Sequence, residues 1–161
     1  MPRTSNLKRR DQPEDFEAPE LMFAELDSLL GYQLRRAQGA MHRDFMAAVA
    51  EFELTQKQAA TLWLIQANAG VSQVEVAAAL GMDRATMMAL TDRLEDRGYL
   101  IRKRSTTDRR RQELYLTPSG QSTLRKCKAR IADHEEKFRA MFTASELASL
   151  VGALKKFQGL G

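Results

Sequence analysis

The chain is poor in cysteine and histidine, the residues on which disulfide-rich proteins and many metal-binding proteins depend. Its 161 residues include one cysteine and two histidines. One cysteine excludes an intrachain disulfide framework, in agreement with a reducing compartment. Neither His42 nor His134 has cysteine, histidine or carboxylate neighbours at metal-ligand spacing, so no metal site is predicted. No glycine-rich phosphate loop or nucleophile elbow is visible, and we expect neither enzymatic activity nor a cofactor.

Long apolar runs are also missing from the sequence. No run approaches the roughly 18 residues that a membrane span requires, and residues 1–12 lack the apolar segment of a secretion signal. We therefore expect no membrane partner and a cytoplasmic location. The composition, 43% hydrophobic and 29% charged, is that of an ordinary globular domain with a sizeable core.

Proline is scarce and unevenly placed. Three of the four prolines fall in residues 1–20, together with a basic patch and an acidic stretch. This composition predicts a flexible tail. A solvated terminus is the favoured interpretation, and a DNA-contacting arm formed by its basic half is the alternative.

Residues 72–98 have the pattern of two helices joined by a tight turn. Ser72 and Glu75 form a capping box, and Val74, Ala77, Ala78 and Leu80 are predicted to be the apolar face. Gly81 suits a left-handed exit, and Asp83 can cap the second helix. In that helix Met87, Leu90, Thr91 and Leu94 form the expected buried stripe, and the outward face holds Arg84, Ala85, Met88, Ala89 and Asp92.

A basic hairpin follows the helix pair. Residues 100–104 and 112–116 alternate as strands do, and residues 105–111 between them lack apolar side chains. Residues 102–111 hold six basic residues and one acidic residue, a net charge of +5 in a chain whose total is +4. Because the rest of the chain is then slightly negative, the positive charge is focused, as expected of a surface that contacts phosphates and the minor groove.

Long apolar helical patterns flank this unit. The residues that recur from Leu26 to Phe52 predict a helix of about 25 residues. Thr55 and Gln58 open a helix that carries Ala59, Leu62, Trp63 and Ile65. Thr117-Pro118 opens another, with Leu124, Cys127, Ile131, His134, Phe138 and Met141 on one seam, and Thr143 and Glu146 cap a last helix. Such helices at both ends of the chain favour a dimer.

These segments resemble the MarR family of dimeric winged-helix transcription regulators. The most specific piece is Asp108-Arg-Arg-Arg-Gln-Glu-Leu-Tyr-Leu-Thr-Pro-Ser-Gly120, supported by Asp92-Arg93-Leu94-Glu95-Asp96-Arg97-Gly98-Tyr99-Leu100. The likeness runs from about Leu30 to Leu150. It implies a mainly α fold with a small β-wing, a homodimer, and a pseudo-palindromic operator in double-stranded DNA. The expected organisation is a tail (1–20), a dimerisation helix (21–54), a winged helix-turn-helix domain (55–117) and C-terminal dimerisation helices (118–161).

The resemblance also implies roles for single residues. Arg93 and Arg102 would anchor phosphate or the wing, and Arg109 or Arg110 would enter the minor groove. The sequence has Met88-Ala89 where the family often has a polar or basic pair, so we expect apolar contact with a thymine methyl there. The predicted DNA-binding residues are Ser72, Gln73, Arg84, Ala85, Thr86, Met88, Ala89, Arg93, Arg102, Asp108, Arg109 and Arg110.

A repressor released by a small molecule is the function that the resemblance implies. The effector would lodge between the dimer helices and the winged unit, and aromatic acids or their coenzyme A thioesters are the expected class. The predicted effector-binding residues are Tyr32, Arg35, Arg36, His42, Arg43 and Trp63. A solvated helix face for the arginines and a core position for Trp63 are the alternatives.

Other functions remain open from the sequence. The winged fold could be a protein-docking module without DNA, or the protein could bind DNA without sequence preference. A redox-sensing regulator acting through Cys127 would need an exposed thiolate of low pKa, whereas the position of Cys127 on an apolar seam favours a small core residue.

Overall fold

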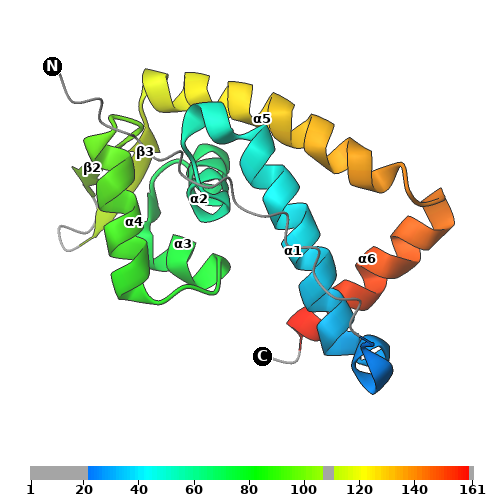
Figure 1. The fold of residues 1–161 in the computed structure, drawn as a ribbon. Coiled ribbons are helices and arrows are strands. Elements are labelled where there is room, and N and C mark those ends of the chain that lie inside the picture. The colour runs from blue at the N-terminus through cyan, green and yellow to red at the C-terminus, as the bar shows by residue number, and fades with distance from the viewer. Residues whose placement is uncertain (1–21, 107–110, 160–161) are drawn as a thin grey trace, which may run out of the picture. The chain divides into compact units, whose positions relative to one another are not determined.

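The structure, a computed structural model, describes residues 22–106 and 111–159. It comprises two units, residues 1–36 and 37–161, whose boundary lies within helix α1 (Leu30–Ala48). Figure 1 shows the elements of both units along the chain.

The described part of the first unit holds the 3-10 helix η1 (Ala24–Ser28) and the beginning of α1. The expected helix of about 25 residues is wrong, because α1 begins only at Leu30 and has 19 residues. Leu29 has an extended backbone with ψ of 121°, which interrupts the helix. The Ser28 hydroxyl donates to the carbonyl oxygen of Glu25 at 2.7 Å, a local bond that competes with helical pairing.

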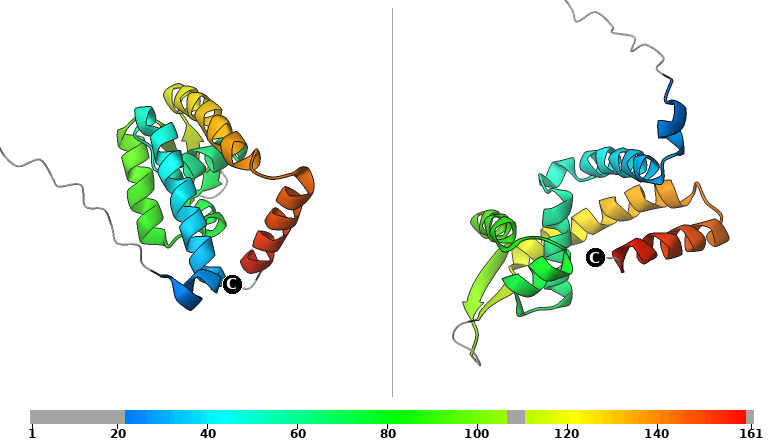
Figure 2. Two further views of the ribbon diagram at one scale, coloured as in Figure 1. Left: turned by 45° about the vertical axis from the view of Figure 1, so that its right-hand side comes forward. Right: turned by 90° about the horizontal axis from the view of Figure 1, so that it is seen from below.

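The second unit contains the remaining elements. After the end of α1 come η2 (Ala50–Phe52), α2 (Gln56–Ala67), β1 (Val71–Ser72), α3 (Gln73–Ala79), α4 (Arg84–Asp96), β2 (Leu100–Arg104), β3 (Gln112–Leu116), α5 (Pro118–Arg139) and α6 (Ala144–Gln158). The strands form an antiparallel sheet in the order β1-β3-β2. The predicted fold class, mainly α with a small β-wing, is confirmed. In Figure 2 the β2–β3 hairpin projects from the helices of this unit.

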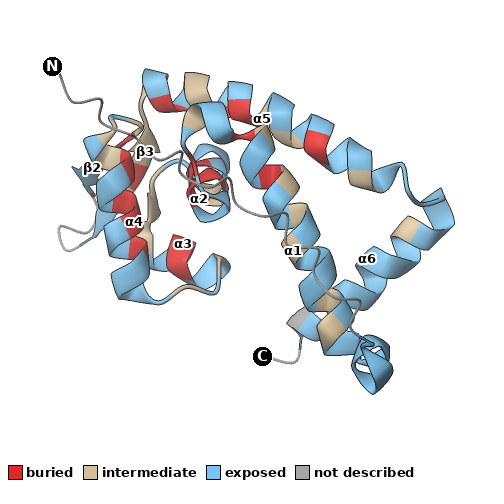
Figure 3. Cartoon of the chain, in the orientation of Figure 1, coloured by how far each residue is buried: buried red, intermediate tan, exposed pale blue. Residues whose placement is uncertain are grey.

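The hydrophobic core lies under the helix-turn-helix, where α2, α3, α4, the sheet and α5 meet. Figure 3 shows the buried residues concentrated on these elements. The large side chains that are almost fully buried include Leu54, Leu62, Ile65, Val76, Met87, Leu94, Leu100, Leu114 and Leu124. The predicted inward stripe of α4, Met87, Leu90, Thr91 and Leu94, is confirmed. Trp63, for which a core position was the alternative to effector binding, has 41% of its surface exposed.

The predicted apolar face of α3 is wrong in part. Val74 and Ala78 are exposed, whereas Val76 and Ala77 are buried. The short strand β1, which the sequence did not predict, gives the reason. Val71 pairs with Leu114 and Ser72 with Glu113, so the sheet fixes the direction in which α3 begins. The pairing thereby determines which side of α3 faces the core.

Polar side chains cap the helices as the sequence predicted. Thr55, Ser72 and Thr143 form capping boxes with Gln58, Glu75 and Glu146, and Thr117 accepts a hydrogen bond from the Gly120 amide. Each box satisfies backbone donors that a helix start leaves open. Bonding from Ser72 and from Thr143 lowers the pKa of Glu75 and of Glu146.

Candidate nucleic-acid interface

The turn between α3 and α4 has the geometry that a steep helix crossing requires. Gly81 has φ of +59°, the left-handed conformation that glycine adopts without strain. The Met82 amide donates to the Ala77 carbonyl at 2.9 Å and the Gly81 amide to the Ala78 carbonyl at 3.2 Å, which together close a Schellman motif. Asp83 then caps α4 by accepting from the Thr86 amide at 2.8 Å. Hydrogen bonds from the Thr86 hydroxyl and amide lower the pKa of Asp83.

Helix α4 presents one side to the core and the other to solvent. The side opposite the buried stripe holds Arg84, Ala85, Thr86, Met88, Ala89 and Arg93, all of them exposed. An exposed face on the second helix of a helix-turn-helix is the surface that enters a major groove. These positions are therefore free to meet a ligand without disturbing the core.

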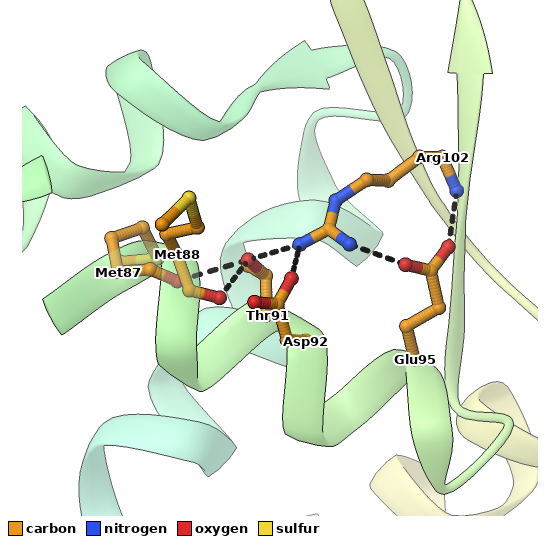
Figure 4. Close-up of polar contacts among 6 residues, drawn as sticks. All are labelled: Met87, Met88, Thr91, Asp92, Glu95 and Arg102. Atoms are coloured by element: carbon orange, nitrogen blue, oxygen red, sulfur yellow. Dashed lines mark hydrogen bonds and ion pairs between the residues drawn. The ribbon is translucent and has the colours of Figure 1, made fainter. Parts of the chain in front are cut away.

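Arg102, on strand β2, fastens the wing to α4. Its guanidinium donates to Thr91 Oγ1 at 2.7 Å and to Asp92 Oδ1 at 2.6 Å, and it also pairs with Glu95 (Figure 4). The side chain is only 18% exposed. The Thr91 hydroxyl in turn donates to the carbonyl oxygens of Met87 and Met88, at 2.9 and 3.0 Å. The contacts of Arg102 are thus with α4, and the network fixes the spacing between helix and wing.

Arg111, the residue before β3, links the wing to α3. Its guanidinium lies 2.9 Å from Glu75 Oε2, and Glu75 also accepts from the backbone and hydroxyl of Ser72. Glu75, which completes the capping box of α3, therefore links this helix to the wing. The sequence placed Arg111 in the basic hairpin but did not reveal this link.

Several of the predicted DNA-binding residues line two separate recesses. One is lined by Ser72, Gln73, Val74, Arg84, Met88, Arg111 and Gln112. The other is lined by Thr55, Lys57, Gln58, Thr86, Ala89, Leu90 and Arg93. Met88 and Ala89, neighbours in sequence, therefore lie in different recesses. Lys57, which sequence reasoning missed, adds an exposed cation beside Arg93 from the first turn of α2.

The base of the wing carries exposed positive charge. Lys103 and Arg104 on β2 are exposed, and Lys103 Nζ lies 5.1 Å from the centre of the Tyr115 ring. Asp108, Arg109 and Arg110, predicted for the tip, lie outside the described residues. Their contacts with DNA stay a prediction.

Arg97 at the end of α4 has a structural role that sequence reasoning missed. Its guanidinium donates to the carbonyl oxygens of Glu53 at 2.7 Å and Phe52 at 2.8 Å, and it lies 4.8 Å from the centre of the Tyr99 ring. Glu53 has φ of +50°, an unfavourable conformation for a residue other than glycine. Arg97 holds that turn and connects it to α4. A partner more than forty residues away leaves no local pattern by which to find it.

The residues predicted to bind an effector fall in both units. In the first, the guanidinium groups of Arg35 and Arg36 lie 5.4 and 5.7 Å from the centre of the Tyr32 ring, and Arg36 also pairs with Asp27 at 3.3 Å. In the second, His42 and Arg43 are exposed on α1. The Nζ of Lys128 lies 4.1 Å from the centre of the Trp63 ring and donates to Gln66 Oε1 at 2.6 Å. The sequence did not indicate Lys128 as a cation beside the indole.

Cys127 and His134 occupy the positions expected of packed residues. Cys127 is fully buried, and burial raises the pKa of its thiol, the opposite of what a redox sensor needs. His134 Nδ1 lies 2.8 Å from Asp44 Oδ1, and its ring packs edge-on against Phe45 and Phe138. Within residues 22–106 and 111–159 there is no group of side chains arranged to hold a metal ion. None of the helices in those ranges has the length and apolarity to span a bilayer.

An exposed second helix, a tight glycine turn and a basic hairpin fastened to both helices define a winged helix-turn-helix protein. The sequence model of the MarR family matches residues 52–111 of the chain. A putative transcriptional regulatory protein for the hcr operon of Thauera aromatica is 32% identical over 150 residues, 92% of this chain and 90% of that protein. The chain belongs to the MarR family, and the predicted resemblance is confirmed.

Solved structures of two regulators are similar to the chain over most of its length. The transcriptional repressor CouR, bound to a 23-mer DNA duplex, is 38% identical with a TM-score of 0.82, over 86% of this chain and 99% of that chain. CouR bound to p-coumaroyl-CoA is 36% identical with a TM-score of 0.79, over 86% and 98% of the two chains. The PcaV transcriptional regulator from Streptomyces coelicolor, in complex with its natural ligand, is 31% identical with a TM-score of 0.78, over 86% and 98%.

Proposed function

We propose that the protein is a homodimeric, sequence-specific DNA-binding repressor that an aromatic acid or its coenzyme A thioester releases from its operator. It acts by occupying DNA, with no catalytic step. The observation that carries the proposal is the exposed face of α4, held at a fixed spacing from a basic wing by Arg102. This arrangement lets one helix enter a major groove while the hairpin reaches the neighbouring backbone.

Two kinds of contact are proposed for this face. Gln73, Arg84 and Met88 meet base edges, because they line the recess between α3 and α4. Thr86, Arg93 and Lys57 meet the phosphate backbone from the second recess. Ser72, Ala85, Ala89, Asp108, Arg109 and Arg110 complete the proposed set. Arg102 belongs to it as the residue that positions the wing.

Dimerisation follows from the apolar side chains that a single chain leaves exposed. Leu150, Val151, Leu154 and Phe157 on α6 are each between 37 and 46% exposed. A second copy that covers them would remove this apolar surface from water. Two copies related by a two-fold axis then match two half-sites about one helical turn apart.

The effector class is supported by the relatives. CouR, the repressor solved on DNA, was also solved with p-coumaroyl-CoA. An effector releases the operator only if it binds the DNA-free shape more tightly than the DNA-bound shape. Tyr32, Arg35, Arg36, His42, Arg43 and Trp63 are the proposed contacts. Lys128 joins them because of its position beside Trp63.

The DNA part of the proposal is tested by selecting fragments of the source genome on the purified protein and measuring their affinity by fluorescence anisotropy. We expect a preferred palindromic fragment and an affinity that falls steeply as salt rises, because counterions are released from the contacted phosphates. The double variant Arg109→Ala with Arg110→Ala should bind weakly. Equal affinity for the selected fragment and for random duplex would contradict sequence-specific binding.

The effector part is tested by titrating p-coumaroyl-CoA, free p-coumarate and acetyl-CoA into the protein bound to its fragment. Release by the aromatic compounds, and not by acetyl-CoA, is the expected result. Trp63→Ala should raise the concentration needed for release and leave the affinity for DNA unchanged. If neither aromatic compound binds in calorimetry nor releases DNA, the class is wrong.

A further inference from the structure

Two apolar side chains lie exposed on the candidate DNA-binding face. Val74 on α3 is 50% exposed and Met88 on α4 is 55% exposed. Met87, the residue before Met88, is fully buried in the core. The rotation of α4 therefore places one methionine in the core and the next on the outer surface.

Val74 and Met88 line the same recess, together with Gln73, Arg84 and Gln112. Ala89 lines the other recess with Lys57 and Arg93, which are suited to phosphate. The structure therefore separates Met88 from Ala89, which the sequence suggested as a pair, and joins it to Val74 from another helix. The described lining of the first recess contains no carboxylate that would repel DNA.

The chemistry of the major groove limits what such a recess can contact. Base edges present hydrogen-bond donors and acceptors there, and the 5-methyl group of thymine is the one apolar group. Phosphates attract cations, whereas apolar side chains make no favourable electrostatic contact with a phosphate. Gln73 and Arg84 flank the apolar pair and can bond to the acceptors of neighbouring bases.

We propose that Val74 and Met88 form a receptor for the 5-methyl group of one thymine in each half-site of the operator. This inference rests on the proposed function. Met88 supplies a flexible, polarisable wall that adapts to the methyl group, and Val74 supplies a second, stiffer wall. The Met88 carbonyl accepts a hydrogen bond from the Thr91 hydroxyl, and Arg102 donates to the same hydroxyl (Figure 4). The hydrogen bonds that join Arg102 to α4 therefore also fix the position of the Met88 backbone relative to the wing.

The proposal is tested with duplexes in which deoxyuridine replaces thymine, because this exchange removes the methyl group and leaves base pairing intact. The selected fragment is prepared with one symmetric pair of thymines replaced at a time. At one pair we expect affinity to fall about fourfold for each methyl group removed, the effect of burying one such carbon. The Met88→Ala protein should bind the thymine and uracil duplexes at that pair equally.

Met88→Leu is the matched control, since it keeps an apolar side chain of similar volume and should keep the preference for thymine. Thermal unfolding should be unchanged in Met88→Ala, because the side chain is exposed. If the wild-type protein binds its fragment specifically and every uracil duplex equally well, the methyl receptor is wrong and the proposed function stands. A thymine preference that persists in both Met88→Ala and Val74→Ala also overturns the receptor. Failure to prefer any fragment over random DNA would instead overturn the proposed function.

Discussion

Arg102 shows that a cation beside the DNA-binding face can support DNA binding indirectly, by holding two elements of the fold together. A basic residue at the start of a wing suggests a phosphate contact, yet its guanidinium is bonded to Thr91, Asp92 and Glu95 and is largely covered. A phosphate would have to compete with two carboxylates already in place. We infer that Arg102 strengthens DNA binding by fixing the wing relative to α4.

The salt dependence of DNA binding separates this positioning role from a phosphate contact. Arg102→Ala should lower the free energy of unfolding by about 2 kcal/mol, because it removes charged hydrogen bonds. It should also weaken DNA binding, with little change in the slope of log K against log salt. Arg93→Ala, the matched exposed variant, should reduce that slope by about one for each phosphate that the protein no longer neutralises. A reduced slope in Arg102→Ala would show that Arg102 does contact phosphate.

Asp44 makes stability depend on pH through its contacts with α5. Hydrogen bonding from His134, and then from Lys137, lowers the pKa of Asp44 below its ordinary value of 3.8. A lowered pKa contributes stability above the unfolded value, and this contribution is lost as pH falls through the folded value. Asp44→Asn should therefore be less stable than wild type in urea at pH 7, and the difference should shrink below about pH 4. A difference that stays constant with pH would exclude this linkage.

At the scale of elements, the segment Thr117 to Gly120 joins three parts of the fold. The Thr117 hydroxyl donates to the Gly98 carbonyl at 2.6 Å, and its amide donates to the Tyr99 carbonyl at 3.1 Å. A Cβ added at Gly120 would lie 1.9 Å from the Tyr99 carbonyl oxygen. This part of the family signature therefore holds the start of α5 against the turn between α4 and β2.

Because Gly120 lies so close to the Tyr99 carbonyl, we expect one added methyl group to lower the stability of the protein strongly. Gly120→Ala should destabilise the protein by about 3 kcal/mol or more, because backbone has to move to remove the clash. Gly31→Ala is the control, since its added Cβ would meet nothing within 4 Å beyond the adjacent backbone of its own helix, and alanine favours a helix. Urea denaturation of both variants is the measurement. Similar stability of the two would show that α5 can shift at little cost.

Elements with a local pattern were predictable and those that depend on distant partners were not. Both wing strands and the inward stripe of α4 follow from alternation and helical spacing, and the structure confirms them. Strand β1 has two residues, too few to show a period, and it determines the exposed face of α3. Arg97 acquires its role from hydrogen bonds to a distant turn, and Lys57 lines a recess with residues of another helix, so neither leaves a local pattern. The candidate site was thus predicted on α4 and missed on α2.

At the scale of the whole molecule, the exposed apolar face of α6 predicts that the dimer depends on this helix. Leu150→Glu with Leu154→Glu should give a folded monomer in sedimentation experiments, because neither side chain is buried within the chain. Operator affinity should fall sharply, since each half-site would be bound alone. Lys155→Glu on the same helix is the control for added negative charge. A double variant that remains dimeric would show that α6 is not the interface.

The buried thiol of Cys127 makes the protein suited to site-directed labelling. Maleimide and methanethiosulfonate reagents attack accessible thiolates, and this sulfur is both shielded and hard to deprotonate. A cysteine introduced at an exposed position of the recognition helix, for example Asp96→Cys at the end of α4, would therefore take a fluorophore or spin label without removal of the native residue. Distances between two such labels in the dimer would then report directly how far an effector moves the paired recognition helices.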